Sequence, residues 1–107
     1  MQPDFLFFVE NADGELEPAV VDPHGHYLTD ALAKLRALAN FADEYGDRFM
    51  RIEAVSKNDK GDLGMALKGK LMMLDMLNHN VRVSIRESES AAAVYRDVGV
   101  EYQAVTQ

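Results

Sequence analysis

The segment FLFFVENADGELEPAVVDPHG, residues 5–25, decides the fold of this chain. Its first five residues form an apolar run of aromatic and β-branched side chains, which is typical of a buried strand. The Asp13-Gly14 pair that follows favours a tight turn, because glycine adopts positive φ at little cost. Residues 16–21 are then predicted to form the returning strand, and Pro23 ends regular pairing because it lacks a backbone N–H donor. The sheet is therefore predicted to open with an antiparallel hairpin.

A long amphipathic helix is predicted from Leu28 to Tyr45, because apolar residues recur there at intervals of three and four. Asp30 or the preceding threonine can cap its start, and Gly46 suits a left-handed position after its end. Residues 49–55 are predicted to form a third strand. The order strand, helix, strand implies a right-handed crossover, with the long helix packed on one face of the sheet.

The last third of the chain is less clearly patterned. Residues 63–77 are rich in Met and Leu, but Gly64 and Gly69 interrupt them, so helix and strand-plus-turn are both open. Two short helices and an edge strand are predicted after this segment, at residues 81–87, 90–98 and 100–105. We expect a single α/β domain over residues 1–107, with a small mixed sheet, the long helix on one face and short C-terminal helices.

Composition limits the classes of function. The chain has 107 residues, enough to bury a core, and it has no cysteine, which excludes disulfides and thiolate metal sites. Its formal net charge of −7 opposes tight autonomous binding to nucleic acid and to anionic membranes. No segment has the roughly 18 apolar residues that a membrane-spanning helix needs. We expect a cytoplasmic protein that associates with no membrane.

Two aspartates mark the outer ends of the hairpin strands. Asp4 precedes the first strand and Asp22 ends the second, so antiparallel pairing would bring the two carboxylates together. His24 lies two residues beyond Asp22, on the same side of an extended chain. We expect Mg²⁺ bound by Asp4 and Asp22, with His24 orienting or deprotonating a water that attacks a phosphodiester. The alternative is that Asp4 is a solvated acid and that residues 22–25 form an ordinary turn.

The order of Pro-Asp, hairpin, acid-x-base tripeptide, helix and strand resembles the core of the PD-(D/E)xK restriction-endonuclease superfamily. More narrowly, the chain resembles the nuclease-like C-terminal region of type III restriction-type superfamily 2 helicases, on the following residues: Val21–Gly25, Asp30, Lys34, Leu35, Arg51–Val55, Lys70–Asp75 and Val81–Ile85. The resemblance implies a DNA-processing nuclease domain that acts with a helicase motor or partner subunit. His24 stands where the family has lysine, and Lys34 on the long helix can supply the missing positive charge.

Other readings of the same residues stay open. The domain can instead be a non-catalytic interaction or oligomerisation module, with a Met-rich docking face formed by Met65, Met72, Met73 and Met76. Asp22, His24 and His26 alternate as zinc ligands do, although Pro23 and Gly25 favour a turn. Residues 64–70 match the glycine and lysine spacing of a phosphate-binding loop, but Leu71 replaces the Ser or Thr that binds Mg²⁺, so we expect no nucleotide.

Overall fold

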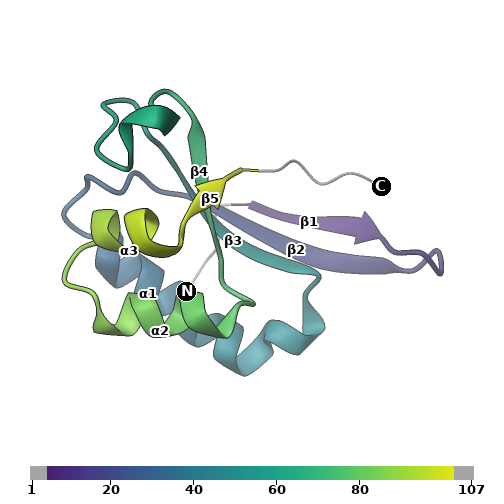
Figure 1. Cartoon of the computed structure of the whole chain (residues 1–107). Coiled ribbons are helices and arrows are strands. Elements are labelled where there is room, and N and C mark those ends of the chain that lie inside the picture. The colour runs from purple at the N-terminus through teal and green to yellow at the C-terminus, as the bar shows by residue number, and fades with distance from the viewer. Residues whose placement is uncertain (1–4, 103–107) are drawn as a thin grey trace.

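The computed structural model describes residues 5–102 of the chain. Along the chain, the elements are β1 (Phe5–Glu10), β2 (Leu16–Pro23), α1 (Ala31–Tyr45), η1 (Gly46–Arg48), β3 (Arg51–Lys57), η2 (Met65–Leu67), β4 (Leu71–Asp75), α2 (His79–Glu87), α3 (Ala91–Val98) and β5 (Val100–Glu101). The strands form one mixed sheet in the order β1-β2-β3-β4-β5 (Figure 1). β2 and β3 pair in parallel, and the other neighbours pair antiparallel.

The opening hairpin is confirmed. Asn11 closes the turn, because its backbone N–H donates to the Glu15 carbonyl at 2.8 Å and its side-chain oxygen accepts from the backbone N–H groups of Asp13 and Glu15. Gly14 has a φ of +82°, which explains why glycine occupies this position. The hairpin projects beyond the helices at one end of the molecule (Figure 1).

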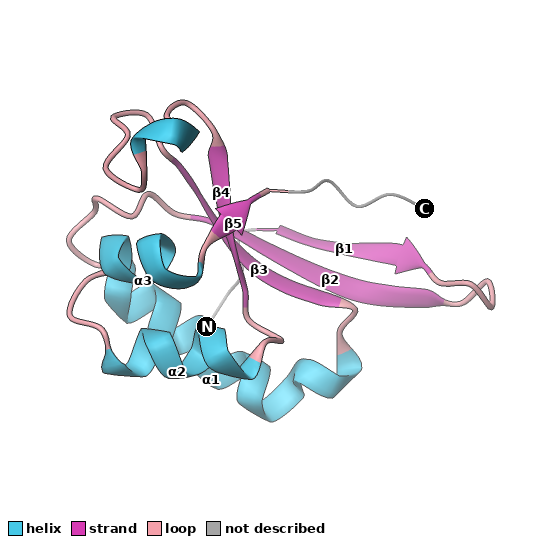
Figure 2. Ribbon diagram, viewed as in Figure 1, coloured by secondary structure: helices cyan, strands magenta, loops and turns pink. Residues whose placement is uncertain are grey.

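All three α-helices of the described chain lie on one face of the sheet (Figure 2). The strands present Val20, Ile52 and Leu74 to this face, and each is fully buried. The helices pack fully buried apolar side chains against this face, among them Leu38, Ile85 and Val94. Burial of such side chains contributes about 1.5–3 kcal/mol each, so this layer supplies most of the stability of the fold.

Several sequence expectations need correction. The long helix begins at Ala31 rather than Leu28, and the Asp30 side chain makes no capping hydrogen bond. Gly46 has a φ of −57°, not a left-handed conformation, because the chain continues into η1. Residues 63–77 form a loop containing η2, then β4 and the turn after it. The predicted last strand is shorter, since β5 ends at Glu101, and residues 103–105 lie outside the described part.

The prediction of an exposed Met-rich docking face is also wrong, because three of the four methionines are buried. Met72, Met73 and Met76 are at most 8% exposed, because β4 and the turn after it bury their side chains. Met65 alone among the four is exposed. Met72 and Met76 therefore fill the core, as flexible unbranched side chains often do, whereas Met73 lies on the opposite face of the sheet, where its sulfur is 3.9 Å from Arg51 Nη2.

The face of the sheet opposite the helices carries a buried ion pair. Arg51 Nη2 lies 2.5 Å from Glu53 Oε2, and Glu53 is only 2% exposed. Burial raises the pKa of the Glu53 carboxyl, and the positive charge of Arg51 opposes this rise. The negative charge of Asp75, which pairs with Glu53 from β4, raises the pKa further. The pair shows that this face of β3 is shielded from water although no α-helix covers it in residues 5–102.

The helical layer predicts a specific contrast between two leucines. Leu38→Ala should lower the free energy of unfolding by about 2–5 kcal/mol, because it opens a cavity where α1 meets the sheet. Leu28→Ala should cost less than about 1 kcal/mol, since Leu28 is 43% exposed. Urea unfolding measures both, and equal losses would contradict the packing described here.

Candidate functional site

The candidate site lies where β2 and β3 end. Parallel strands end at the same edge of a sheet, so the segments that follow them, residues 24–30 and 58–70, leave the sheet side by side. The carboxyl edge of parallel strands is a common position for binding sites in α/β proteins. The hydrogen bond from His24 N–H to the Val55 carbonyl, at 3.1 Å, extends the parallel pairing into the site.

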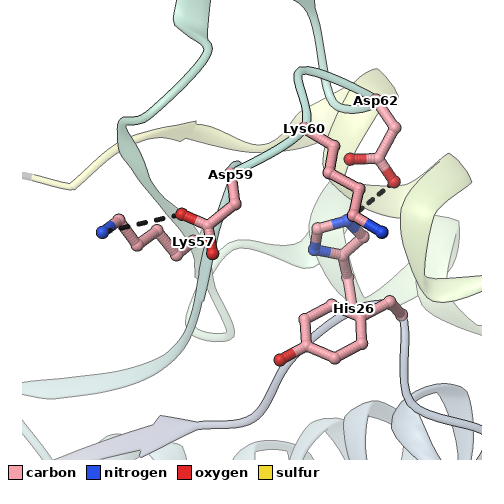
Figure 3. Close-up of a pocket in the computed structure, with 6 residues that line it drawn as sticks. His26, Lys57, Asp59, Lys60 and Asp62 are labelled. Carbon is pink, nitrogen blue, oxygen red and sulfur yellow. Dashed lines mark hydrogen bonds and ion pairs between the residues drawn. The ribbon is translucent and has the colours of Figure 1, made fainter.

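A cavity of about 250 Å³ opens at this edge. Its lining comes from both segments: His26, Tyr27, Lys57, Asp59, Lys60 and Asp62. Figure 3 shows Lys60 and Asp62 extending from one loop toward His26, with Lys57 and Asp59 as a second pair beside them. Lys57 Nζ lies 3.6 Å from Asp59 Oδ1, a loose contact that leaves both side chains largely in water. Four of the six residues that line this cavity therefore carry charged side chains.

Tyr27 supplies the aromatic part of the lining. Its ring meets the His26 ring edge to face at 5.7 Å, and the residue is 73% exposed. A Cβ atom at residue 25 would come within 2.7 Å of Tyr27 Cε1, so Gly25 provides the space in which this ring lies. An exposed aromatic ring next to lysines offers a docked ligand both apolar area and charge.

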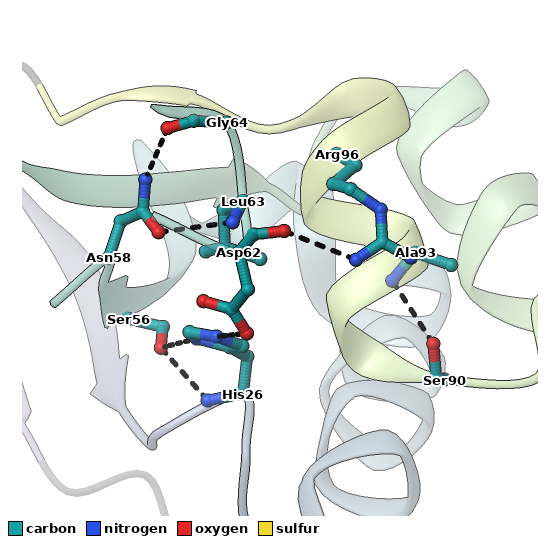
Figure 4. A network of polar contacts seen from close by, with 9 residues as sticks. All are labelled: His26, Ser56, Asn58, Asp62, Leu63, Gly64, Ser90, Ala93 and Arg96. Carbon is teal, nitrogen blue, oxygen red and sulfur yellow. Dashed lines mark hydrogen bonds and ion pairs between the residues drawn. The ribbon is translucent and has the colours of Figure 1, made fainter. Parts of the chain in front are cut away.

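His26 joins the two segments (Figure 4). Its Nε2 lies 2.9 Å from Asp62 Oδ2, and its Nδ1 lies 2.7 Å from Ser56 Oγ. A carboxylate only accepts hydrogen bonds, so Nε2–H is the donor to Asp62. The backbone N–H of His26 also donates to Ser56 Oγ, at 2.9 Å. A side chain that is 3% exposed is thus satisfied at both ring nitrogens.

Asn58 fixes the shape of the longer loop. The residue is fully buried, its Nδ2 donates to the Gly64 carbonyl at 2.9 Å, and its Oδ1 accepts from Leu63 N–H at 3.0 Å. Its backbone pairs with Lys70 and Gly69. Gly64 and Gly69 both have positive φ, which lets the loop close on Asn58. The loop is therefore held internally as well as by His26.

The loop differs in charge from the rest of the molecule. Residues 57–70 carry four lysines against two aspartates, in a chain of net charge −7. Lys57, Lys60, Lys68 and Lys70 are all exposed. The hydrogen bond from His26 lowers the pKa of Asp62, so this carboxyl stays ionised next to the lysines. We name residues 57–70 the lysine loop.

Three of the predicted site residues, Asp22, His24 and Lys34, lie within the described part of the chain, and each has different neighbours. Asp22 is 5% exposed and faces the helical layer near Tyr95, whose pKa is raised by burial and by the charge of Asp22. His24 Nε2–H donates to Asp30 Oδ1 at 2.7 Å, and this bond lowers the pKa of Asp30. Lys34 is exposed in the first turn of α1, where its backbone N–H donates to the Asp30 carbonyl.

The metal expectations stay predictions. Asp4, the second predicted Mg²⁺ ligand, lies outside the described residues. Within residues 5–102, no three acidic or histidine side chains gather as a metal group. His24 and His26, which the sequence offered with Asp22 as zinc ligands, have different partners: His24 is hydrogen-bonded to Asp30, whereas His26 is hydrogen-bonded to Asp62. The glycine-lysine segment at 64–70 leads directly into β4, whereas a phosphate-binding loop leads into a helix.

Sequence reasoning missed Ser56, Asn58, Asp62 and the lysines around them. It ended the third strand at residue 55 and gave residues 56–62 no role. The available signal was the density of lysine in this segment, which contrasts with an acidic chain. The contacts to His26 had no such signal, because they join residues 30 and 36 positions apart.

Ser56, His26 and Asp62 have the side-chain types of a hydrolase triad, but their environment favours a structural role. Ser56 is 3% exposed, and its oxygen already accepts from the His26 backbone N–H. In the neutral ring, Nδ1 then accepts the Ser56 hydroxyl proton. Arg96 of α3 donates to the Asp62 carbonyl at 3.2 Å and fixes the loop from the other side. The arrangement holds the segment after β3 against the segment after β2.

These features define a small α/β domain with a charged pocket at the carboxyl edge of its parallel strands. The chain belongs to the YagJ family, whose defining pattern matches residues 1–103. It is 38% identical over 95 residues to Protein YagJ of Escherichia coli strain K12. The match covers 89% of this chain and 35% of that protein, so the chain spans about a third of the length of its curated relative. No solved structure matches the chain.

The pKa of Asp62 predicts a dependence of stability on pH. A carboxyl whose folded pKa lies below its ordinary value of 3.8 stabilises the fold above that pH, and loses this contribution as pH falls through the folded pKa. The stability difference between wild type and Asp62→Asn should therefore be constant near neutral pH and shrink below about pH 4. Urea unfolding across this range measures it.

Asp59→Asn is the matched control, because Asp59 lies in the same loop and contacts only the exposed Lys57 among the ion pairs described. It should change stability little at any pH. An Asp59→Asn effect as large as that of Asp62→Asn would reject the special role of the His26 contact.

Proposed function

We propose that this domain is a non-catalytic protein-interaction module that docks an acidic segment of a partner at the lysine loop. The observation that supports this best is the reversal of charge: an acidic chain collects four of its eleven basic residues in one stretch of 14 positions at the carboxyl edge of its sheet. Exposed lysines with the exposed Tyr27 ring offer charge and apolar area to such a segment.

The rigidity of the pocket supports binding rather than chemistry. His26 and Asn58 hold the loop by buried hydrogen bonds, so little conformational entropy is lost when a ligand docks. Within residues 5–102, Lys60 makes no ion pair and is available to a ligand carboxylate. No helix of the described chain is long and apolar enough to cross a membrane. We place the module in the cytoplasm, in keeping with a chain without cysteine.

The docking proposal predicts binding of a fluorescently labelled hexaglutamate peptide. Lys57→Gln with Lys60→Gln should weaken binding about tenfold, because both lysines line the cavity. Lys34→Gln, which removes an exposed lysine from α1, should leave binding unchanged. Fluorescence anisotropy at low salt measures all three proteins, and the affinity should fall as salt rises.

Failure of the wild type to bind hexaglutamate, or an equal loss in Lys34→Gln, would count against the proposal. The first result would show that the lysine loop does not recognise carboxylates. The second would show that binding follows total charge rather than this surface.

A Mg²⁺-dependent nuclease-like domain of a helicase-associated DNA-processing system is the second candidate. The position of Asp22 supports it, since this buried carboxylate lies one residue before the end of β2, at the edge where β3 also ends. In this candidate, Asp4 and Asp22 hold Mg²⁺, His24 or Lys34 assists, and DNA is held by a motor domain or partner subunit. The resemblance to the restriction-endonuclease superfamily gives these roles.

The nuclease candidate predicts that Mn²⁺ or Mg²⁺ raises the melting temperature of the wild type. Asp22→Asn and Asp4→Ala should each abolish this rise, whereas Asp59→Asn, at an exposed position, should keep it. Thermal denaturation with and without metal measures the effect. A rise of the same size in all four proteins, or none in the wild type, rejects the metal site.

A further inference from the structure

We infer that the acidic segment docked by the lysine loop is the β1–β2 hairpin of a second copy of this chain, so that copies associate head to tail. This inference rests on the proposed function and names its partner. Two observations at opposite ends of the sheet support it. At one end, the hairpin exposes both acidic and apolar side chains. At the other end, the lysine loop lies beside exposed aromatic and apolar side chains.

The hairpin end is acidic throughout. Residues 10–17 contain four carboxylates and no basic residue: Glu10, Asp13, Glu15 and Glu17. Glu10, Asp13 and Glu15 are exposed around the turn. This is the inverse of the charge on residues 57–70. The two ends are therefore electrostatically complementary, although the whole chain repels its copies through its net charge.

The hairpin also exposes large apolar side chains on the face that packs helices elsewhere. Leu16, Pro18 and Val20 are spaced by two residues along β2, so they lie on the same face of the sheet as the core. Phe8 pairs with Pro18 and lies on this face as well. The hairpin extends past the helices (Figure 1), and Phe8 is 61% and Leu16 69% exposed. Nothing in residues 5–102 covers them.

The lysine-loop end has matching apolar side chains. Tyr27 is 73% exposed in the cavity wall, and Met65 is 69% exposed in η2. A docked hairpin would place Leu16 against this apolar area. The carboxylates of the hairpin would then lie near Lys57 and Lys60. Charge and apolar area are thus paired at both ends of one chain, which is why a second copy fits better than an unrelated acidic protein.

The geometry fixes the kind of assembly. β2 has 8 residues, and the hairpin turn and the cavity lie at its two ends, so about 25 Å of strand separates them. The hairpin therefore cannot reach the lysine loop of its own chain. Contacts between different surfaces of successive copies are heterologous, and they produce rings or open chains rather than a closed two-fold dimer.

Charge reversal at each end tests the inference. We expect the weight-average mass of the wild type, measured by analytical ultracentrifugation, to rise with concentration at low salt and to fall toward the monomer at high salt. A hairpin-reversed variant, Glu15→Lys with Glu17→Lys, and a loop-reversed variant, Lys57→Glu with Lys60→Glu, should each stay monomeric. An equimolar mixture of the two variants should associate again, because the unchanged hairpin of one variant then meets the unchanged lysine loop of the other.

The matched control reverses charges on α1, outside both the hairpin and the lysine loop. Lys34→Glu with Glu44→Lys, at exposed positions of α1, should associate as the wild type does. A monomeric wild type at every concentration would overturn the inference, as would reversed variants that associate like the wild type, or a mixture that stays monomeric. Hexaglutamate binding by a monomeric wild type would overturn head-to-tail association while leaving the docking function intact.

Discussion

The parallel pairing of β2 with β3 is the constraint on which the rest of this structure depends. Two parallel strands need a crossover, and α1 provides it while covering the sheet face that holds Val20 and Ile52. The same pairing sends residues 24–30 and 58–70 off one edge of the sheet. His26 and Asp62 meet there because of topology, and the pocket exists because these two segments leave the strands together.

Buried polar contacts between and within residues 24–30 and 58–70 fix the shape of the surface that these segments form. A loop with seven charged or amide side chains would sample many conformations in water, but Asn58 and His26 fix it from within and from the neighbouring segment. Both side chains are buried, so each unmade hydrogen bond would cost about 1–3 kcal/mol. The cost of leaving these groups unsatisfied selects one loop conformation, which places the lysines outward and keeps them there.

The sequence predicts the elements better than it predicts the site. Local signals sufficed for the hairpin, through Asp13-Gly14, and for α1, through its leucine spacing. The stretch from 63 to 77 stayed ambiguous, because Gly64 and Gly69 interrupt its Met and Leu residues. Asp22 and His24 were correctly placed at a strand end. Ser56, Asn58 and Asp62 were missed, because their roles come from contacts with residues distant in the chain or from a loop conformation without a sequence signature.

Native-state hydrogen exchange at single amides tests most directly whether the lysine loop is a preformed surface. The Leu63 amide donates to Asn58 Oδ1 and the Gly69 amide to the Asn58 carbonyl, both inside the loop. If buried contacts hold the loop, these two amides should exchange nearly as slowly as the amides of β3. Exchange as fast as that of the Asp13 amide, in the exposed hairpin turn, would show that the loop opens freely and is not a preformed surface.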